Sequence, residues 1–234
     1  MQPVTTGPDA PPLPPRYVAQ HRLGVGGMAE VWRAEDGLLG ATVAIKVCRA
    51  GVAQDPQLRH RFVREATLTA QLRHPGIPSV HDRGDLPDGR PYFVMEEVRG
   101  LNLTEATRRH HQGAPRWTLR RLVEALGRAC QAVAYAHSAG VLHRDLKPDN
   151  LMLGEFGQVH VVDWGLARPM ADLDPEGDVR VSSSLGTTTQ VGQILGSPAY
   201  MAPEQARGAA GLGPEVDVYA LGACLYQVLT GRPP

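Results

Sequence analysis

Residues 142–150 read LHRDLKPDN and place two acids, one amide and two cations within nine residues. The segment follows a predicted helix and precedes the strand-like residues 151–153. Packing does not explain so polar a segment between apolar stretches, because buried charges are costly without partners. Asp145, Lys147 and Asn150 can all face one side of a loop. The pattern therefore indicates a site of chemistry rather than a piece of the core.

A second acid follows a predicted buried strand. Residues 159–168 read VHVVDWGLAR, in which a β-branched run leads directly to Asp163. A carboxylate beside a core is costly unless a cation meets it. Asn150 and Asp163 offer oxygen ligands of the kind that Mg²⁺ binds alongside waters and phosphate oxygens. We therefore predict that Asp163 meets a metal; the alternative is that it caps the strand.

Earlier in the chain, a glycine-rich hairpin precedes an interior lysine. Residues 23–31 read LGVGGMAEV between two predicted strands, and glycines there allow a ligand to approach closely and permit positive φ. Lys46 ends the alternating strand VAIK, so its ammonium can reach whatever lies under the hairpin. An interior lysine needs an anion, and Glu65 is the only carboxylate between Asp55 and Asp82. The alternatives are an ordinary tight turn and a lysine that extends into solvent.

The composition excludes several classes of protein. The 234 residues suffice for one large domain or two small ones, and 42% are hydrophobic against 21% charged. Lys and Arg number 24, as do Asp and Glu, so no basic excess indicates nucleic acid or an anionic membrane. Cys48, Cys130 and Cys224 are far apart, which argues against disulfides or a zinc site and favours a reducing compartment. No apolar stretch approaches about 18 residues and the N-terminus lacks an apolar signal core, so we expect a cytoplasmic protein without membrane contact in this chain.

Two regions of different character follow a leader. Residues 1–15 are rich in proline without a hydrophobic period, which predicts a disordered or polyproline leader. In residues 16–98, short β-branched and aromatic segments alternate with turns that contain glycine. Residues 99–234 are mostly helical in pattern. A small β-rich lobe followed by a helical lobe is an α+β architecture.

Three helices are expected from their apolar spacing. Residues 55–72 repeat apolar residues at helical intervals. Another helix begins after Thr118, a suitable N-cap, and stops at Gly140. Residues 215–231 are hydrophobic on nearly every face, so this helix is expected to be buried.

Together these segments resemble the eukaryotic-like serine/threonine protein kinases of bacteria. The resemblance covers residues 17–230 and implies a bilobal protein-kinase-like fold, with the N-lobe at 16–98 and the C-lobe at 99–234. The matching motifs are the glycine-rich loop (Gly24, Gly26, Val31), the lysine strand (Val43 to Lys46), the catalytic loop (His143, Arg144, Asp145, Leu146, Asn150), the metal motif (Asp163, Trp164, Gly165) and the end of the activation segment (Ala202, Pro203, Glu204).

The resemblance implies catalytic roles for four of these residues. Lys46 contacts the α- and β-phosphates of ATP and pairs with Glu65. Asp145 accepts the proton of the substrate hydroxyl, and Lys147 steadies the γ-phosphate. Alignment and charge neutralisation carry such a reaction, since phosphoryl transfer needs little covalent help.

The resemblance also implies the metal and nucleotide contacts. Asn150 and Asp163 hold Mg²⁺, with Mn²⁺ as an alternative ion. The adenine is implied to lie between apolar side chains and to bond backbone groups of Glu96 and Val98, with Met95 at the gatekeeper position. The residues implied to contact ATP are Leu23, Gly24, Val25, Gly26, Gly27, Met28, Ala29, Glu30, Val31, Ala44, Lys46, Met95, Glu96, Val98 and Met152.

The implied activity is ATP-dependent transfer of phosphate to serine and threonine hydroxyls of proteins, in bacterial signalling. Lys147, two residues after Asp145, and Ser197 in GSPAYMAPE resemble serine/threonine rather than tyrosine kinases. The implied partners are protein substrates, including a kinase homodimer for autophosphorylation. The alternative is a nucleotide-binding pseudokinase or scaffold without transfer activity, and the intact set Lys46, Glu65, Asp145, Asn150 and Asp163 argues against it.

Two residues depart from the family pattern without removing a catalytic group. Ala29 replaces the third glycine of the loop, a change expected to stiffen it. Trp164 replaces the usual phenylalanine beside the metal aspartate, and we expect that flipping this segment out is harder.

His110 and His111 have no partner at ligand spacing, so a solvated helix end is favoured over a metal site.

The segment between Asp163 and Glu204 is expected to be regulated by phosphorylation. It contains SSSLGTTTQ at 182–190, and Arg144 can engage a phosphate. The alternative is a flexible polar insert.

Because the chain stops at LTGRPP directly after the apolar helix, whereas related kinases continue in further helices, we expect an incomplete C-lobe.

Overall fold

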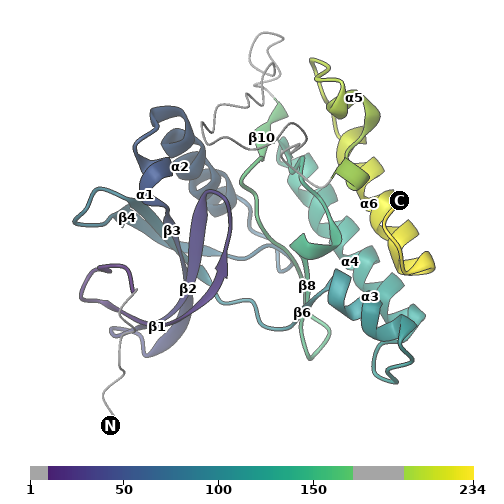
Figure 1. Ribbon diagram of the computed structural model, residues 1–234, viewed down its shortest axis with the longest axis horizontal. Helices are drawn as coiled ribbons and strands as arrows, with labels where there is room; N and C mark the ends of the chain where they lie inside the picture. Colours follow the sequence, from purple (N-terminus) through teal and green to yellow (C-terminus); the bar gives the residue numbers. More distant parts are fainter. Residues whose placement is uncertain (1–9, 171–197) are drawn as a thin grey trace. The chain divides into compact units, whose positions relative to one another are not determined.

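The computed structural model of the chain describes residues 10–170 and 198–234 (Figure 1). The chain divides into two compact units: unit 1 contains the residues up to Arg73 together with Ile77–Val98, and unit 2 contains the rest. Unit 1 is a sheet with two helices, whereas unit 2 is mostly helical. The α+β class predicted from the sequence is confirmed.

Unit 1 is built on a five-stranded antiparallel sheet with strand order β1-β2-β3-β5-β4. The β-branched segments of the sequence form these strands, and the predicted three-strand run is β1, β2 and β3. The elements of unit 1 are β1 (Tyr17–Val25), β2 (Ala29–Asp36), β3 (Ala41–Cys48), α1 (Ala50–Ala53), α2 (Pro56–Gln71), β4 (Val80–Asp85) and β5 (Pro91–Glu96).

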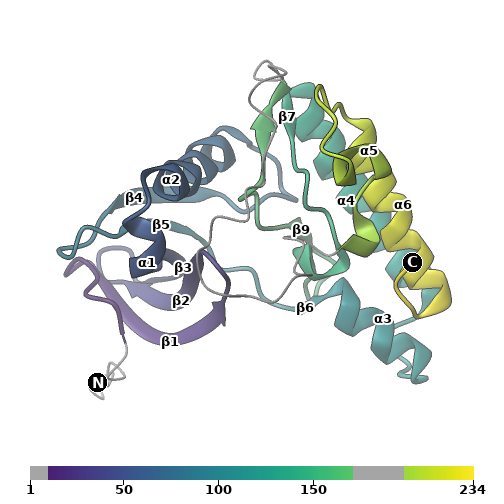
Figure 2. The same ribbon diagram turned by 45° about the horizontal axis from the view of Figure 1, so that its top comes forward.

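The two faces of the sheet have separate cores, because side chains alternate along each strand. Val43, Ile45 and Val47 of β3 belong to one cluster, with Trp32 and neighbouring residues. Cys48 belongs to the cluster on the other face, which also includes residues of α1 and α2. Figure 2 shows α2 running alongside β4 and β5, and it contacts both strands. Lys46 shares the parity of Cys48, so it lies on the α2 side of the sheet.

The helix predicted at 55–72 is confirmed as α2. Asp55 caps its N-terminus by accepting hydrogen bonds from the N–H groups of Gln57 and Leu58 at 2.8 and 3.1 Å. Pro56 is the first helical residue, where its missing N–H costs nothing. Residues on the inner side of α2, including Phe62 and Ala66, pack onto the sheet.

Residues 10–15 differ from the disordered leader predicted from their proline content. Ala10 and Leu13 pack against the cluster around Trp32, and turns are closed within the segment by backbone hydrogen bonds. Arg16, which follows, lies 2.7 Å from Asp36, and its hydrogen bonds lower the pKa of that carboxyl to about 2. Proline favours an extended chain, but apolar contacts with a core are enough to order it. Residues 1–9 lie outside the described part of the chain.

Unit 2 is organised around the long helix α4. Thr118 caps its N-terminus through Oγ1, and Gly140 follows its C-terminus with φ of 76°, as the sequence predicts. The elements of unit 2 are β6 (Leu101–Asn102), α3 (Leu103–His111), α4 (Leu119–Ser138), β7 (Val141–Leu142), η1 (Pro148–Asn150), β8 (Leu151–Leu153), β9 (Val159–Val161), β10 (Arg168–Pro169), η3 (Pro198–Tyr200), α5 (Pro203–Ala206) and α6 (Glu215–Thr230).

The apolar helix α6 lies beside α4, and both views show the two side by side (Figures 1 and 2). Within the described structure α6 is buried on one side only, although its apolar sequence predicts cover on nearly every face. Val218 and Leu229 are 62% and 53% exposed within the described structure, because α4 covers a single face. No helix within residues 10–170 and 198–234 combines the length and apolar character needed to cross a membrane.

Candidate active site

The glycine-rich segment forms the turn between β1 and β2. Gly26 donates its N–H to the carbonyl of Ala29 at 2.8 Å and so closes the hairpin. None of Gly24, Gly26 and Gly27 has positive φ, so these residues do not use the left-handed conformation that glycine permits. A Cβ on Gly24 or Gly27 would meet no atom within 4 Å. The glycines therefore keep space open beside the main chain. The side chain of Ala29 is buried in the core on the α2 side, which accommodates its methyl group.

Lys46 and Glu65 form an ion pair inside unit 1. Lys46 Nζ lies 2.6 Å from Oε1 of Glu65, and only 13% and 8% of the two side chains are exposed. The ammonium also lies 5.9 Å from the centre of the Phe93 ring. The pair predicted from the sequence is present, and the alternative of a solvated lysine is wrong because the ammonium is held against a buried carboxylate.

The residues predicted to contact ATP, apart from Met152, belong to unit 1, whereas Met152 is on β8 of unit 2. Met95 lies near the end of β5. The next residue, Glu96, donates its N–H to the carbonyl of Ser79 at 2.9 Å. That N–H is therefore committed to the sheet and is not available to a ligand.

In unit 2, three polar residues of the segment 142–150 converge. Lys147 Nζ lies 2.8 Å from Oδ2 of Asp145. Asn150 donates from Nδ2 to the carbonyl of Asp145 at 2.8 Å. The Asp145 and Lys147 side chains remain partly exposed, at 17% and 21%. A carboxylate held in this way can accept a proton, and the neighbouring ammonium can neutralise an anion.

The buried imidazole of His143 connects this loop to the strand before Asp163. Its Nδ1 accepts the N–H of Asp145 at 3.2 Å, which assigns the proton to Nε2. Nε2 then donates to the carbonyl of Val162 at 3.2 Å. Val162 donates its own N–H to the carbonyl of Asn150 at 2.9 Å. One side chain therefore positions both acidic segments.

Asp217 anchors the same loop from α6, a role that the sequence analysis missed. Its oxygens accept the N–H groups of His143 and Arg144, each at 2.8 Å, and Nε2 of His137 lies 2.8 Å from Oδ2. Burial raises the pKa of this carboxyl, but the hydrogen bonds from His137 and the two N–H groups outweigh it and leave the pKa lowered. Gln205 donates to the carbonyl of Arg144 at 2.7 Å.

The backbone of Arg144 needs this support. Its φ of 67° lies in the left-handed region, which is strained by about 1–3 kcal/mol for a residue with a bulky side chain. The strained residue directly precedes Asp145. Bonds at both its N–H and its carbonyl therefore fix the position of the candidate catalytic carboxylate.

Asp163 is also left-handed, with φ of 64°, and its side chain is exposed. This carboxylate is therefore not enclosed in the core, and its role as a metal ligand stays a prediction. Trp164 is buried and donates its indole N–H to the carbonyl of Val161 at 3.0 Å. Its ring centre lies 4.6 Å from that of His143. This N–H bond is one that phenylalanine lacks.

Replacing Asp217 with asparagine is expected to lower the free energy of unfolding by about 1–3 kcal/mol, because an amide offers one acceptor oxygen instead of two. The difference in free energy of unfolding between the variant and the unaltered protein should become smaller as the pH falls below about 3.9, the ordinary pKa of aspartate. The lowered pKa means that the native carboxylate stabilises the fold above that value and ceases to do so as it is protonated. Denaturant unfolding at several pH values measures this. Glu215→Gln, an exposed acid on the same helix, is the control, and an equal loss in both variants would contradict the prediction.

The two histidines considered as metal ligands have structural roles, and the predicted phosphorylation sites lie outside the described residues. His110 Nδ1 lies 2.8 Å from the carbonyl of Trp117, and His111 Nε2 lies 3.1 Å from the carbonyl of Val228. The described residues contain no group of three or more His, Cys, Asp and Glu side chains able to hold a metal. The residues outside the described ranges include Ser197 and the predicted phosphorylation sites Ser182, Ser183, Ser184, Thr187, Thr188 and Thr189.

Comparison with known proteins agrees with this geometry. The family profile of the protein kinase domain matches residues 17–234, so the chain belongs to the protein kinase domain family. It is 41% identical to "Serine/threonine-protein kinase PknB" of Mycolicibacterium smegmatis over 225 residues, which are 95% of this chain and 33% of the relative. It is 43% identical to "Probable serine/threonine-protein kinase SCO3848" of Streptomyces coelicolor over 222 residues, 94% of this chain and 31% of that protein. The chain spans about a third of the length of these relatives.

Proposed function

We propose that this chain is the catalytic domain of an ATP-dependent serine/threonine protein kinase of bacterial signalling. The observation that carries the proposal is the cluster in which Lys147 lies 2.8 Å from Asp145 and Asn150 is bonded to the Asp145 backbone. Relatives at about two fifths identity carry the serine/threonine kinase name. We further propose that unit 1 corresponds to an N-lobe at 16–98 and unit 2 to a C-lobe at 99–234.

The residues of each unit have a task in this proposal. Lys46, held by Glu65, binds the α- and β-phosphates, and the open glycine turn lets main-chain groups approach the nucleotide. Asp145 accepts the proton of the incoming hydroxyl, which raises the nucleophilicity of its oxygen. Lys147 neutralises charge on the transferred phosphoryl group.

Protein kinases as a family use ATP and Mg²⁺. The donor set of unit 2 fits this ion, because Asn150 directs its amide N–H₂ to Asp145 and keeps Oδ1 for another partner, while Asp163 presents an exposed carboxylate. Hard oxygen donors of this kind suit Mg²⁺ or Mn²⁺. When bound, the ion neutralises phosphate charge. The task of Asn150 and Asp163 is to hold it.

The proposed partners are proteins that present serine or threonine, including a second copy of this chain for autophosphorylation. We place the domain in the cytoplasm. Cys48, Cys130 and Cys224 are all free thiols, which suits a reducing compartment. The balance of 24 basic and 24 acidic residues gives no support to a nucleic acid partner.

The alternative is a nucleotide-binding pseudokinase that transfers nothing. Incubation of the protein with γ-labelled ATP, Mg²⁺ and a generic basic protein separates the two. We expect label on serine and threonine of the acceptor, together with autophosphorylation detected by mass spectrometry. Nucleotide binding without any transfer would support the pseudokinase instead.

A further inference from the structure

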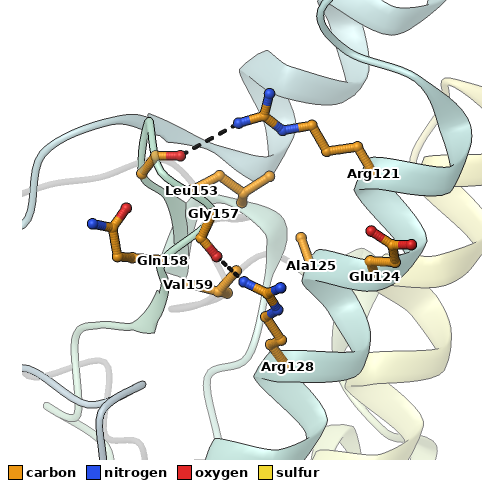
Figure 3. Close-up of a pocket in the computed structure, with 9 residues that line it drawn as sticks. Arg121, Glu124, Ala125, Arg128, Leu153, Gly157, Gln158 and Val159 are labelled. Atoms are coloured by element: carbon orange, nitrogen blue, oxygen red, sulfur yellow. Dashed lines mark hydrogen bonds between the residues drawn. The ribbon is translucent and has the colours of Figure 1, made fainter.

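A cationic surface lies on unit 2 where α4 meets the hairpin between β8 and β9. Figure 3 shows Arg121 and Arg128 extending from α4 to this hairpin. Arg121 reaches the carbonyl of Gly154 at 3.5 Å, and Arg128 donates to the carbonyl of Gly157. We call the surface formed by Arg121, Arg128 and residues 154–157 the arginine–hairpin surface.

The two guanidinium groups keep most of their hydrogen-bonding capacity. Each guanidinium group has five N–H groups. Within the described residues, each donates a hydrogen bond to a single backbone carbonyl. The nearby acids have arginine partners outside this pair: Glu124 pairs with Arg120 at 2.8 Å and more weakly attracts Arg128, and Glu155 lies 3.8 Å from Arg116. In Figure 3 the Glu124 carboxylate stays close to α4. The surface is therefore locally positive on a chain with no net charge.

The Arg121 guanidinium is also held in place. Its carbon lies 4.6 Å from the centre of the Trp117 ring, and Trp117 is itself buried. Stacking of this kind fixes the plane of an arginine and directs its donors along the edge. A fixed arginine loses less entropy when it binds a carboxylate, so it suits recognition better than a mobile one.

An exposed aromatic residue lies on the same hairpin that the two arginines contact. Phe156, at the tip of the hairpin, is 89% exposed. The tip is ordered, because Gln158 Oε1 accepts the N–H of Phe156 at 3.1 Å and Gly154 donates its N–H to the Gln158 carbonyl at 2.8 Å. The ring contributes nothing to the core and offers apolar area to a partner.

We propose that the arginine–hairpin surface docks an acidic segment of protein substrates, with an apolar side chain of that segment against Phe156. Arginine matches the planar carboxylate group through paired N–H bonds, and aromatic and arginine residues are the side chains most enriched at the centres of protein interfaces. The term substrate rests on the proposed kinase function; the docking itself does not. The glutamates at the edge and the zero net charge favour a protein over a nucleic acid.

Binding is tested by fluorescence anisotropy with a labelled Glu-Glu-Leu-Glu-Glu peptide. The double variant Arg121→Gln/Arg128→Gln is expected to weaken binding by about tenfold or more, and Phe156→Ser by about threefold to tenfold. Arg83→Gln removes one positive charge from an exposed site on unit 1 and should change nothing. Phe156→Ser keeps the proposal testable if the double variant loosens the hairpin, because the ring of Phe156 is 89% exposed and its loss should leave the fold intact.

Equal binding by Phe156→Ser and the unaltered protein would overturn the proposal, as would equal binding of a Lys-Lys-Leu-Lys-Lys peptide. Tighter binding of oligodeoxythymidine than of the acidic peptide, lost in the same variants, would assign the surface to nucleic acid instead and overturn it too. A second measurement compares a serine peptide with and without the acidic segment. Phe156→Ser should raise KM only for the peptide that carries the segment. Absence of transfer to both peptides would refute the kinase function, whereas the binding experiment would still decide the docking.

Discussion

Asp145→Asn is expected to lower kcat by about 10²–10⁴-fold while the affinity for ATP stays nearly unchanged, because the carboxylate acts on the incoming hydroxyl and not on the nucleotide. Turnover of a serine peptide and displacement of a fluorescent nucleotide are measured side by side. Loss of nucleotide affinity in proportion to turnover would contradict the assigned role.

The environment of Asp145 demands a control for stability. Its carboxylate lies 2.8 Å from Lys147, so the asparagine variant also removes an ion pair. Asp149→Asn makes the same chemical change at an exposed residue of η1, where Oδ1 accepts a hydrogen bond of 3.3 Å from Asn102. We expect Asp149→Asn to retain turnover within about twofold, since surface changes of this kind have small effects. A similar melting temperature for both variants would show that the loss in Asp145→Asn is chemical.

Lys46→Met is expected to reduce kcat/KM by about 10²-fold or more, since a fixed cation on the phosphates is removed. It should also destabilise unit 1, because Glu65 is only 8% exposed and faces the ammonium at 2.6 Å. Glu65→Gln should give a milder loss of activity, since the lysine remains but is held less firmly. Steady-state kinetics and thermal melting measure both effects.

The double variant Lys46→Met/Glu65→Gln separates the two consequences of losing the pair. Removing both charges leaves no buried carboxylate opposite a methionine, so stability should recover in part relative to Lys46→Met alone. Activity should not recover, because the phosphate contact is still missing. A silent Glu65→Gln would show that the helix partner of Lys46 has no functional role.

Local pattern was sufficient to predict the strands, the main helices and one long-range contact. Alternation along β3 and the presence of a single carboxylate on α2 together identified the pair of Lys46 and Glu65, because few other arrangements satisfy an interior lysine. Motif spacing brought Asp145, Lys147 and Asn150 together correctly, since their contacts form within one short loop. Contacts between residues that are near one another in the chain can therefore be predicted from the sequence.

The hydrogen bonds that anchor the segment 142–150 to α6 could not be predicted in the same way. Asp217 bonds the backbone of residues more than 70 positions away, so its role depends on how α6 packs beside α4. A signal did exist, because Asp217 stands between Val216 and Val218 in a mostly apolar helix. Asp163 also follows an apolar run, yet it is exposed. Pattern alone does not distinguish a buried acid from an exposed one at the end of an apolar run.

The indole of Trp164 gives this protein an optical signal that phenylalanine at the same position would lack. Tryptophan emission moves to longer wavelength when the ring passes from a core into water, and this ring is 2% exposed against His143. The chain has two other tryptophans, Trp32 and Trp117, and both are buried. With those two changed to phenylalanine, the remaining fluorescence would follow the segment of Asp163 in real time, without an attached dye. A movement of this segment that exposed the ring would therefore be detected as a shift in the emission of Trp164.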